Sequence, residues 1–227
     1  MTDPAFGADG SWPLVPPGIW LEARSPKPPT PGPGLFLDRD GVVVDDMGFL
    51  AAPEDVQLLA GAAELIAEAN RRAVSVVVVT NQSGIARQRF GWAEFARVES
   101  EIARRLAAAR ARVDVVAACP FHPEFTANYG AVESHWRKPG PGLLLATARL
   151  MNIDIAMSWL VGDRARDIEA ARNAGLAGAI HLIGAAADQS RTVERTESSD
   201  GFHVSVAATP LESLEILKGV GLLDDCS

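Results

Sequence analysis

Short apolar runs of strand length alternate with helical stretches from residue 34 onward. The runs that predict strands are 35–37, 74–79, 113–118, 158–161, 179–183 and 202–207. The stretches that predict helices are 61–72, 92–111, 140–151, 165–174 and 210–219. Strands that are apolar throughout and alternate with helices are typical of parallel sheets covered on both faces. We therefore expect an α/β fold, a doubly wound, Rossmann-like parallel sheet of about five or six strands with helices on both faces.

The N-terminal end of the chain and one internal segment do not follow this pattern. Residues 1–33 contain nine of the fifteen prolines, which excludes a long helix or a central strand there. We expect an extended N-terminal arm on the surface, followed by a single domain over residues 34–227. Residues 184–201 are polar and without periodicity, which predicts a loop.

Composition and charge argue against several classes of binding partner and several cellular locations. The net charge is −8 and no long block of lysine or arginine occurs, which argues against nucleic acid and anionic membrane. The chain has two cysteines, Cys119 and Cys226, too few for a disulfide framework. No apolar run reaches the length of a membrane span, and the first residues do not resemble a signal peptide. We expect a cytoplasmic monomer.

Polar groups follow the predicted strands where each one ends. Asp38 and Asp40 follow the first strand, the segment 80–83 follows the second, and Asp163 and Asp167 follow the fourth. Arg137 and Lys138 lie just before the helix at 140–151. Ligands of doubly wound sheets bind at the carboxyl ends of the strands, so these groups are predicted to converge on one site.

The chemistry of these groups points to a metal and a phosphoryl group. Asp38 and Asp40 lie two residues apart in an extended segment, so their carboxylates share a face and raise each other's proton affinity. A hard cation with oxygen ligands, such as Mg²⁺, resolves that conflict. The Thr80 hydroxyl, the backbone N–H groups near Ser83 and the Lys138 charge suit phosphoryl oxygens. Each group alone is as well explained by a helix cap or a solvated loop, and only their joint placement favours a site.

These residues resemble the motifs of the haloacid dehalogenase (HAD) superfamily of phosphotransferases. Its DxD motif corresponds to Asp38-Arg39-Asp40, its second motif to Thr80, its lysine to Lys138, and its GDxxxD motif to residues 162–167. The strings LDRDG, VVVTNQSGIAR, CPxHP, RKPxPG and VGDRxxDIxAA are similar to the branch of histidinol-phosphate and heptose 1,7-bisphosphate phosphatases. The likeness covers about residues 34–183.

The resemblance implies catalytic and metal-binding roles for four aspartates, Asp38, Asp40, Asp163 and Asp167. Asp38 would be the nucleophile that forms an aspartyl-phosphate, and Asp40 would protonate the leaving alcohol and then activate water. Mg²⁺ would be bound by the Asp38 carboxylate, the Asp40 carbonyl and Asp163. Asp167 would support Lys138 or the metal's waters. Members that cleave carbon–halogen bonds lack the second aspartate, so Asp40 favours phosphate chemistry.

The resemblance also implies a substrate surface. Thr80, Asn81 and Lys138 would hold the phosphoryl oxygens. Recognition of the rest of a small phosphorylated sugar is implied for Asp46, Met47, Gly48, Phe49, Gln82, Ser83, Arg137 and Arg164. Only 39 residues separate Asp40 from Thr80, which leaves no room for a large cap domain. The heptose bisphosphate is the favoured substrate, and histidinol phosphate or another small phosphate ester is the alternative.

One departure from the resemblance concerns zinc. Zinc-bearing members of the branch have Cys-x-His and Cys-x-Cys where this chain has Cys119, Phe121, Ser134 and Trp136. His122 and His135 lie one residue away from the matching positions. Structural zinc takes four nitrogen or sulfur ligands, so we do not expect it here. Phe121 and Trp136 would instead pack the loop through apolar contacts.

Two functions of other classes fit the sequence less well. A phospho-accepting receiver domain would carry its aspartate after the third strand, where this chain has Ala117-Ala118-Cys119-Pro120. A binding module without activity would lack one of Asp38, Asp40, Lys138 or Asp163, and all are present. The sequence therefore favours a Mg²⁺-dependent phosphatase.

Overall fold

The computed structural model describes residues 12–184 and 201–223, in which eight strands form one sheet. Across the sheet the order is β1-β2-β5-β4-β3-β6-β7-β8. The strands are β1 (Leu14–Val15), β2 (Ile19–Ala23), β3 (Gly34–Leu37), β4 (Ser75–Asn81), β5 (Val115–Cys119), β6 (Trp159–Gly162), β7 (Gly178–Leu182) and β8 (His203–Ala207). The strands from β5 to β8 in this order pair in parallel, whereas β1–β2 and β2–β5 pair antiparallel.

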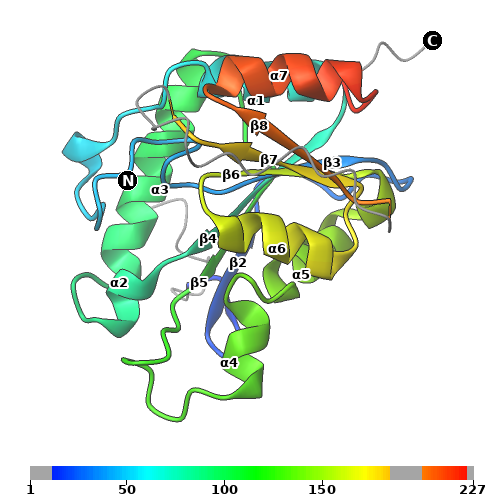
Figure 1. Ribbon diagram of the computed structural model, residues 1–227. Helices are drawn as coiled ribbons and strands as arrows, with labels where there is room; N and C mark the ends of the chain where they lie inside the picture. Colours follow the sequence, from blue (N-terminus) through cyan, green and yellow to red (C-terminus); the bar gives the residue numbers. More distant parts are fainter. Residues whose placement is uncertain (1–11, 185–200, 224–227) are drawn as a thin grey trace.

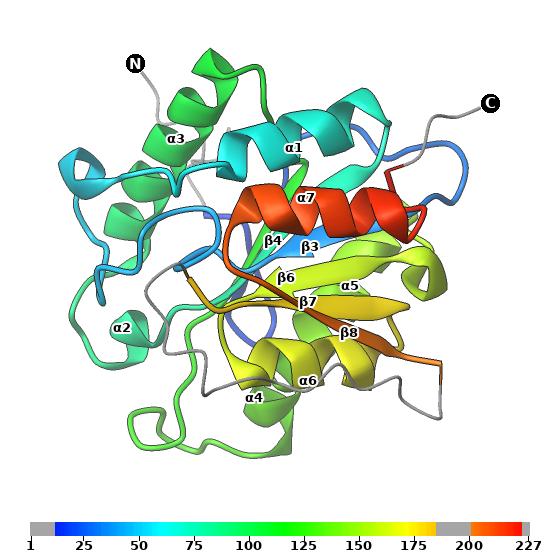
Figure 2. The same ribbon diagram turned by 45° about the horizontal axis from the view of Figure 1, so that its top comes forward.

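Helices cover both faces of the sheet (Figures 1 and 2). They are α1 (Ala62–Arg71), α2 (Ser83–Ala86), α3 (Trp92–Ala108), α4 (Ala131–Trp136), α5 (Gly142–Met151), α6 (Ala165–Ala174) and α7 (Pro210–Gly219), with 3₁₀ turns η1 (Pro53–Asp55) and η2 (Ile155–Met157). α1, α3 and α7 lie on one face, and α5 and α6 lie on the other. The predicted doubly wound α/β class is confirmed.

The alternation of side chains along the central strands builds a core on each face. In β3, Leu35 and Leu37 pack in the cluster that contains the buried residues of α1 and α3, and Phe36 packs in the cluster with α5 and α6. All three side chains are buried, as expected for a parallel sheet covered on both sides. The central strands are therefore held rigidly, and so are the residues at their carboxyl ends.

The predicted elements are present, with different ends and two additional strands. The helix predicted over 92–111 ends at Ala108, and Arg110 beyond it has a positive φ of 58°. The helix predicted from residue 140 begins at Gly142, with Pro141 as its N-cap residue. The sheet has eight strands in the described residues where about five or six were expected, because the N-terminal segment supplies β1 and β2.

The expectation of an arm that only follows the surface is corrected for residues 14–23. β2 pairs with β5, and Ile19 and Trp20 are fully buried. The Trp20 ring lies 5.6 Å from Trp92 and 5.1 Å from Phe95 of α3. Burial of the apolar side chains between the prolines thus allows the segment to form a strand of the sheet despite its proline content. Residues 1–11 and most of the predicted loop 184–201 lie outside the described part, and the boundary at residue 33 stays a prediction.

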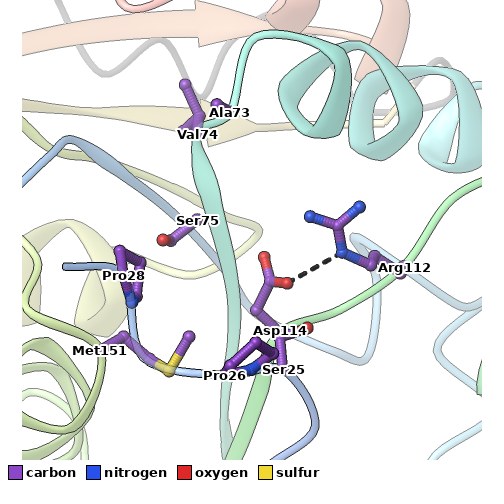
Figure 3. Close-up of a pocket in the computed structure, with 9 residues that line it drawn as sticks. All are labelled: Ser25, Pro26, Pro28, Ala73, Val74, Ser75, Arg112, Asp114 and Met151. Carbon is purple, nitrogen blue, oxygen red and sulfur yellow. Dashed lines mark hydrogen bonds and ion pairs between the residues drawn. The ribbon is translucent and has the colours of Figure 1, made fainter.

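The N-terminal segment is anchored at the amino ends of β4 and β5, where a cavity of about 340 Å³ lies (Figure 3). The carbonyl of Asp114 accepts hydrogen bonds from the backbone N–H groups of Arg24 and Ser25, at 2.8 and 3.3 Å. The Asp114 carboxylate accepts from Val76 N and from Arg112 Nε, at 2.8 and 3.1 Å. Asp114 therefore ties the end of β2 to the sheet.

None of the helices in residues 12–184 and 201–223 combines the length and the apolar content that a bilayer crossing requires.

Candidate active site

A buried ion-pair cluster lies at the carboxyl edge of the sheet. Lys138 Nζ lies 3.0 Å from Asp38 Oδ1 and 2.7 Å from Asp167 Oδ1, and it donates to the Val79 carbonyl at 2.7 Å. Asp38 follows β3, Asp167 is in the first turn of α6, and Lys138 precedes α5. Their exposures are 4%, 0% and 1%, so the charges are shielded from water, and the one lysine offsets only part of the charge of the two carboxylates. The structure thus brings together three residues that are 129 positions apart at most.

Asp38 is held in an environment that opposes its ionisation. Its pKa is raised to about 7, first by burial and also by Asp167, Asp40 and Asp163, and against the opposing effect of Lys138. Its Oδ1 also accepts a hydrogen bond from the N–H of Arg39 at 2.8 Å. A cation beside Asp38 would offset the repulsion from the neighbouring carboxylates and favour the ionised form.

The donors for such a cation are carboxylate oxygens. Asp38, Asp163 and Asp167 each place an oxygen within 4.8 Å of the others, the one group of this kind found in the described ranges. Asp167 already accepts from the Arg164 N–H at 3.0 Å and pairs with Lys138, which leaves Asp38 and Asp163 as the better ligands. Gly41 makes room, because its φ is +82° and a Cβ there would lie 2.7 Å from Asp163 Oδ2. Hard oxygen donors fit Mg²⁺.

The Asp40 carboxylate is held on both oxygens. Its Oδ1 accepts from Arg39 Nε and Nη2, at 3.1 and 2.9 Å. Its Oδ2 accepts from Gln82 Nε2 at 2.9 Å, and the same amide donates to Thr80 Oγ1 at 2.8 Å. Thr80 and Gln82 are buried, and Asp40 is partly exposed, so the carboxylate faces the open edge of the sheet with a fixed orientation.

The Asn81 side chain forms hydrogen bonds with the Lys138 backbone. Its Nδ2 donates to the Lys138 carbonyl, and its Oδ1 accepts from the Lys138 N–H, both at 3.0 Å. The side-chain amide is thus committed to the Lys138 backbone, and the implied role of Asn81 in holding phosphoryl oxygens stays a prediction. Ser83 is the first residue of α2 and lies beside these groups in sequence.

The loop Asp46–Phe49 reaches the site through Arg164. Arg164 Nη2 donates to Asp46 Oδ2 at 2.8 Å, and its Nε lies 2.9 Å from Asp163 Oδ2. Gly48, with a φ of +84°, donates its N–H to Asp46 Oδ1 at 3.0 Å. Met47 and Phe49 are 58% and 47% exposed, so the loop presents apolar side chains to solvent beside the acidic cluster.

The segment 120–136 is connected to Arg137, the neighbour of Lys138, by a hydrogen bond and leads into it along the chain. Arg137 Nη1 donates to the Phe121 carbonyl at 2.8 Å, and burial lowers the Arg137 pKa. Phe121 and Trp136 pack against the core cluster of α5 and α6, as expected for apolar packing of this loop.

The Cys119, His122 and His135 side chains lie in three different environments. Burial raises the pKa of the Cys119 thiol to about 12, and His122 Nε2 lies 3.1 Å from Arg87 Nη2. The His135 ring lies 5.6 Å from the Trp136 ring. The expectation that no structural zinc is bound stays a prediction.

Sequence reasoning missed the residues that orient Asp40. From the sequence, Arg39 is only the middle residue of the DxD motif, whereas in the structure it is almost fully buried and donates twice to Asp40. Glu99 was also missed, although it lies between Phe95 and Ile102 on the apolar face of α3. A carboxylate at an apolar position needs a buried partner, and that signal was available in the sequence.

Comparison with known proteins agrees with this geometry. A family model described as HAD-hydrolase-like matches residues 135–201. The chain is 39% identical over 178 residues to D-glycero-β-D-manno-heptose-1,7-bisphosphate 7-phosphatase of Mesorhizobium japonicum, covering 78% of this chain and 82% of that protein.

Two solved structures share the fold over most of their length. A protein described as a HAD-like phosphatase from Mesorhizobium loti has a TM-score of 0.79 and 34% identity, covering 95% of this chain and 99% of that one. D,D-heptose 1,7-bisphosphate phosphatase from B. bronchiseptica, in complex with magnesium and phosphate, has a TM-score of 0.68 and 30% identity, covering 83% and 99%. These relatives favour phosphatase chemistry over the receiver-domain alternative.

Proposed function

The chain belongs to the HAD-like family of phosphatases, and within it we propose a Mg²⁺-dependent phosphatase that removes the 7-phosphate of D-glycero-D-manno-heptose 1,7-bisphosphate. The observation that carries the proposal is the buried Asp38–Lys138–Asp167 cluster with Asp40 beside it. The names of the relatives support the choice of sugar.

Asp38 is the nucleophile in this proposal. Its carboxylate oxygen attacks phosphorus, the bond to the sugar oxygen breaks, and an aspartyl-phosphate forms. Lys138 lies 3.0 Å from Asp38 Oδ1 and stabilises negative charge on the transferred phosphoryl group. The buried contact with Asp167 and the amide of Asn81 hold Lys138 in this place.

Asp40 is the general acid and base. Its carboxyl group gives a proton to the leaving sugar alkoxide, and its carboxylate then takes a proton from the water that attacks the aspartyl-phosphate. Arg39 and Gln82 orient the group for both transfers. Thr80 is linked to Asp40 through the Gln82 amide, which donates to both side chains.

Asp38 and Asp163, together with the Asp40 carbonyl, are the residues that would hold Mg²⁺, and Asp167 supports them through Lys138. Bound there, Mg²⁺ supplies charge that neutralises the phosphoryl oxygens and the crowded carboxylates. Arg137, Arg164 and the loop of Asp46, Met47, Gly48 and Phe49 select the sugar. Cytoplasmic location and a monomeric state remain part of this proposal.

A panel of phosphate esters tests the proposed function. With Mg²⁺ present, kcat/KM is measured for both anomers of the heptose 1,7-bisphosphate, for histidinol phosphate and for p-nitrophenyl phosphate. We expect the highest value for one heptose anomer, with loss of only the 7-phosphate. A higher value for histidinol phosphate would support the alternative substrate, and the absence of phosphate release from every ester would contradict the chemistry.

A further inference from the structure

A chain of buried charged groups runs from Asp40 away from the active site into the core. Arg39 is the first link, since its Nε and Nη2 both donate to Asp40 Oδ1. Its remaining terminal nitrogen, Nη1, donates to Glu99 Oε1 at 3.4 Å. The guanidinium also lies 5.5 Å from the centre of the Phe95 ring. Arg39 is thus fixed by contacts on three sides.

Glu99 is the second link and lies on the inner face of α3. It is 1% exposed, and its second oxygen, Oε2, lies 3.5 Å from Arg24 Nη2. Arg24 also pairs with Glu22 of β2 at 2.8 Å. Glu99 therefore joins the helix to the end of β2, the strand that the N-terminal segment adds to the sheet.

The backbone at Arg24, the last residue in this series of charged groups, is fixed by hydrogen bonds. The Asp114 carbonyl accepts from the N–H groups of Arg24 and Ser25, and Figure 3 shows Ser25 beside Asp114. The Glu22 side chain also accepts from Trp20 Nε1 at 3.3 Å. β2 therefore presents Arg24 to Glu99 from a backbone position that is itself anchored.

Charge and burial explain why the Arg39–Glu99–Arg24 series of charged groups holds Asp40 so firmly. Burial would lower the Arg39 pKa, but Asp40 and Glu99 raise it above its ordinary value. A guanidinium without its partners at this depth would be costly, so Arg39 has no low-energy alternative position. Its planar fork keeps both donors on Asp40 Oδ1, which restricts rotation of the carboxylate.

We propose that Arg39, Glu99 and Arg24 form a positioning relay through which the N-terminal strand β2 sets the orientation of Asp40 for catalysis. The proposal rests on the proposed function, in which Asp40 transfers protons. Neither Glu99 nor Arg24 touches the substrate in this account. Both act on the reaction only through the position of the Asp40 carboxylate.

The relay should affect one chemical step more than the other. With p-nitrophenyl phosphate the first step forms the Asp38–phosphorus bond and releases p-nitrophenolate, which leaves without a proton from Asp40. The second step breaks that bond by attack of water, whose proton passes to Asp40. A misplaced Asp40 carboxylate therefore slows the second step and lets the aspartyl-phosphate accumulate.

Three variants of the full chain test the relay with p-nitrophenyl phosphate and Mg²⁺. Arg39→Lys keeps the charge but loses the fork, and we expect kcat to fall roughly tenfold or more with a smaller change in KM. Glu99→Gln and Arg24→Gln, which lie further from Asp40, should lower kcat by progressively smaller factors. In rapid mixing each variant should release p-nitrophenolate in a burst larger than that of the wild type.

Glu101→Gln is the matched control. Glu101 is on the same helix and also has two arginine partners, Arg104 and Arg105, at 2.6–2.8 Å. These contacts do not lead to Asp40, so kcat and the burst should equal those of the wild type. Thermal unfolding of each variant distinguishes a loss of folded protein from a change in the chemical step. Arg24→Gln is the variant with the smallest expected effect on folding, because Arg24 is partly exposed.

The outcomes distinguish this inference from the proposed function. If Asp40→Asn abolishes turnover but Arg39→Lys, Glu99→Gln and Arg24→Gln retain wild-type kcat and burst, the relay is wrong and the function stands. A fall in kcat with no increase in the burst also contradicts the relay. If Asp40→Asn itself is fully active, the proposed role of Asp40 fails first.

Discussion

Asp38 is the residue at which burial and charge conflict most directly. Its carboxyl group is 4% exposed and lies among three other aspartates, with Lys138 as the cation within 3.0 Å. The fold holds this arrangement because Lys138 is itself fixed by Asp167 and by the Val79 carbonyl. A carboxylate held in this way would need little rearrangement to act as the proposed nucleophile, at the cost of stability in the metal-free protein.

The cost of ionising Asp38 leads to a prediction on stability. The folded pKa of about 7 lies above the ordinary value of 3.8, so protonation favours the folded state. This contribution is full below about pH 4 and is lost as the pH rises to about 7. Asp38→Asn cannot ionise, so with a chelator present it should be more stable than the wild type at pH 8, by up to about 4 kcal/mol.

The measurement is urea unfolding in the presence of chelator at pH 8 and at pH 5. The advantage of Asp38→Asn should shrink at pH 5, where most of the wild-type Asp38 is protonated. An equal difference at the two pH values would show that ionisation of Asp38 does not strain the fold.

At the scale of elements, the turn between α4 and α5 sets the position of Lys138. The Gly140 N–H donates to the Arg137 carbonyl at 2.7 Å, which closes a tight turn around Lys138. A Cβ on Gly140 would lie against the carbonyl oxygens of Ser134 and His135, which are backbone atoms of α4. The end of α4 and the start of the Lys138 segment are therefore in direct backbone contact.

Gly140→Ala should consequently displace Lys138. We expect a fall in kcat of roughly tenfold or more, since an error of about 1 Å at a reacting centre has that effect. Gly130→Ala is the control, because a Cβ there would meet its nearest atom, Glu133 Oε2, at an ordinary 3.6 Å. Kinetics with p-nitrophenyl phosphate compare the two variants. Equal activity of both would mean that the turn does not position Lys138.

At the scale of the whole molecule, the sequence predicted the sheet better than its edges. Apolar runs such as Val76–Val79 can only be buried between two layers of helices, so β3 to β8 and the main helices were predictable. β2 was not predicted, because it is short and flanked by prolines, although its Ile19 and Trp20 side chains are fully buried in the core. Hydrophobic pattern over a few residues is a weak signal when turn residues flank it.

The same contrast holds for the site. Asp38, Lys138, Asp163 and Asp167 could be predicted to meet because each follows or precedes an element at one edge of a parallel sheet. The partner of each polar group could not be predicted. The Asn81 amide clamps the Lys138 backbone, for example, through a hydrogen-bond geometry that depends on the packed turn.

The most direct test of the account is phosphate release by Asp38→Asn with p-nitrophenyl phosphate and Mg²⁺. We expect a loss of roughly 10³-fold or more in kcat, because no other group can form the covalent intermediate. Circular dichroism should show an intact fold, and Asp55→Asn, at an exposed aspartate in η1, should keep wild-type activity. Undiminished turnover by folded Asp38→Asn would contradict the central claim that this carboxylate is the nucleophile.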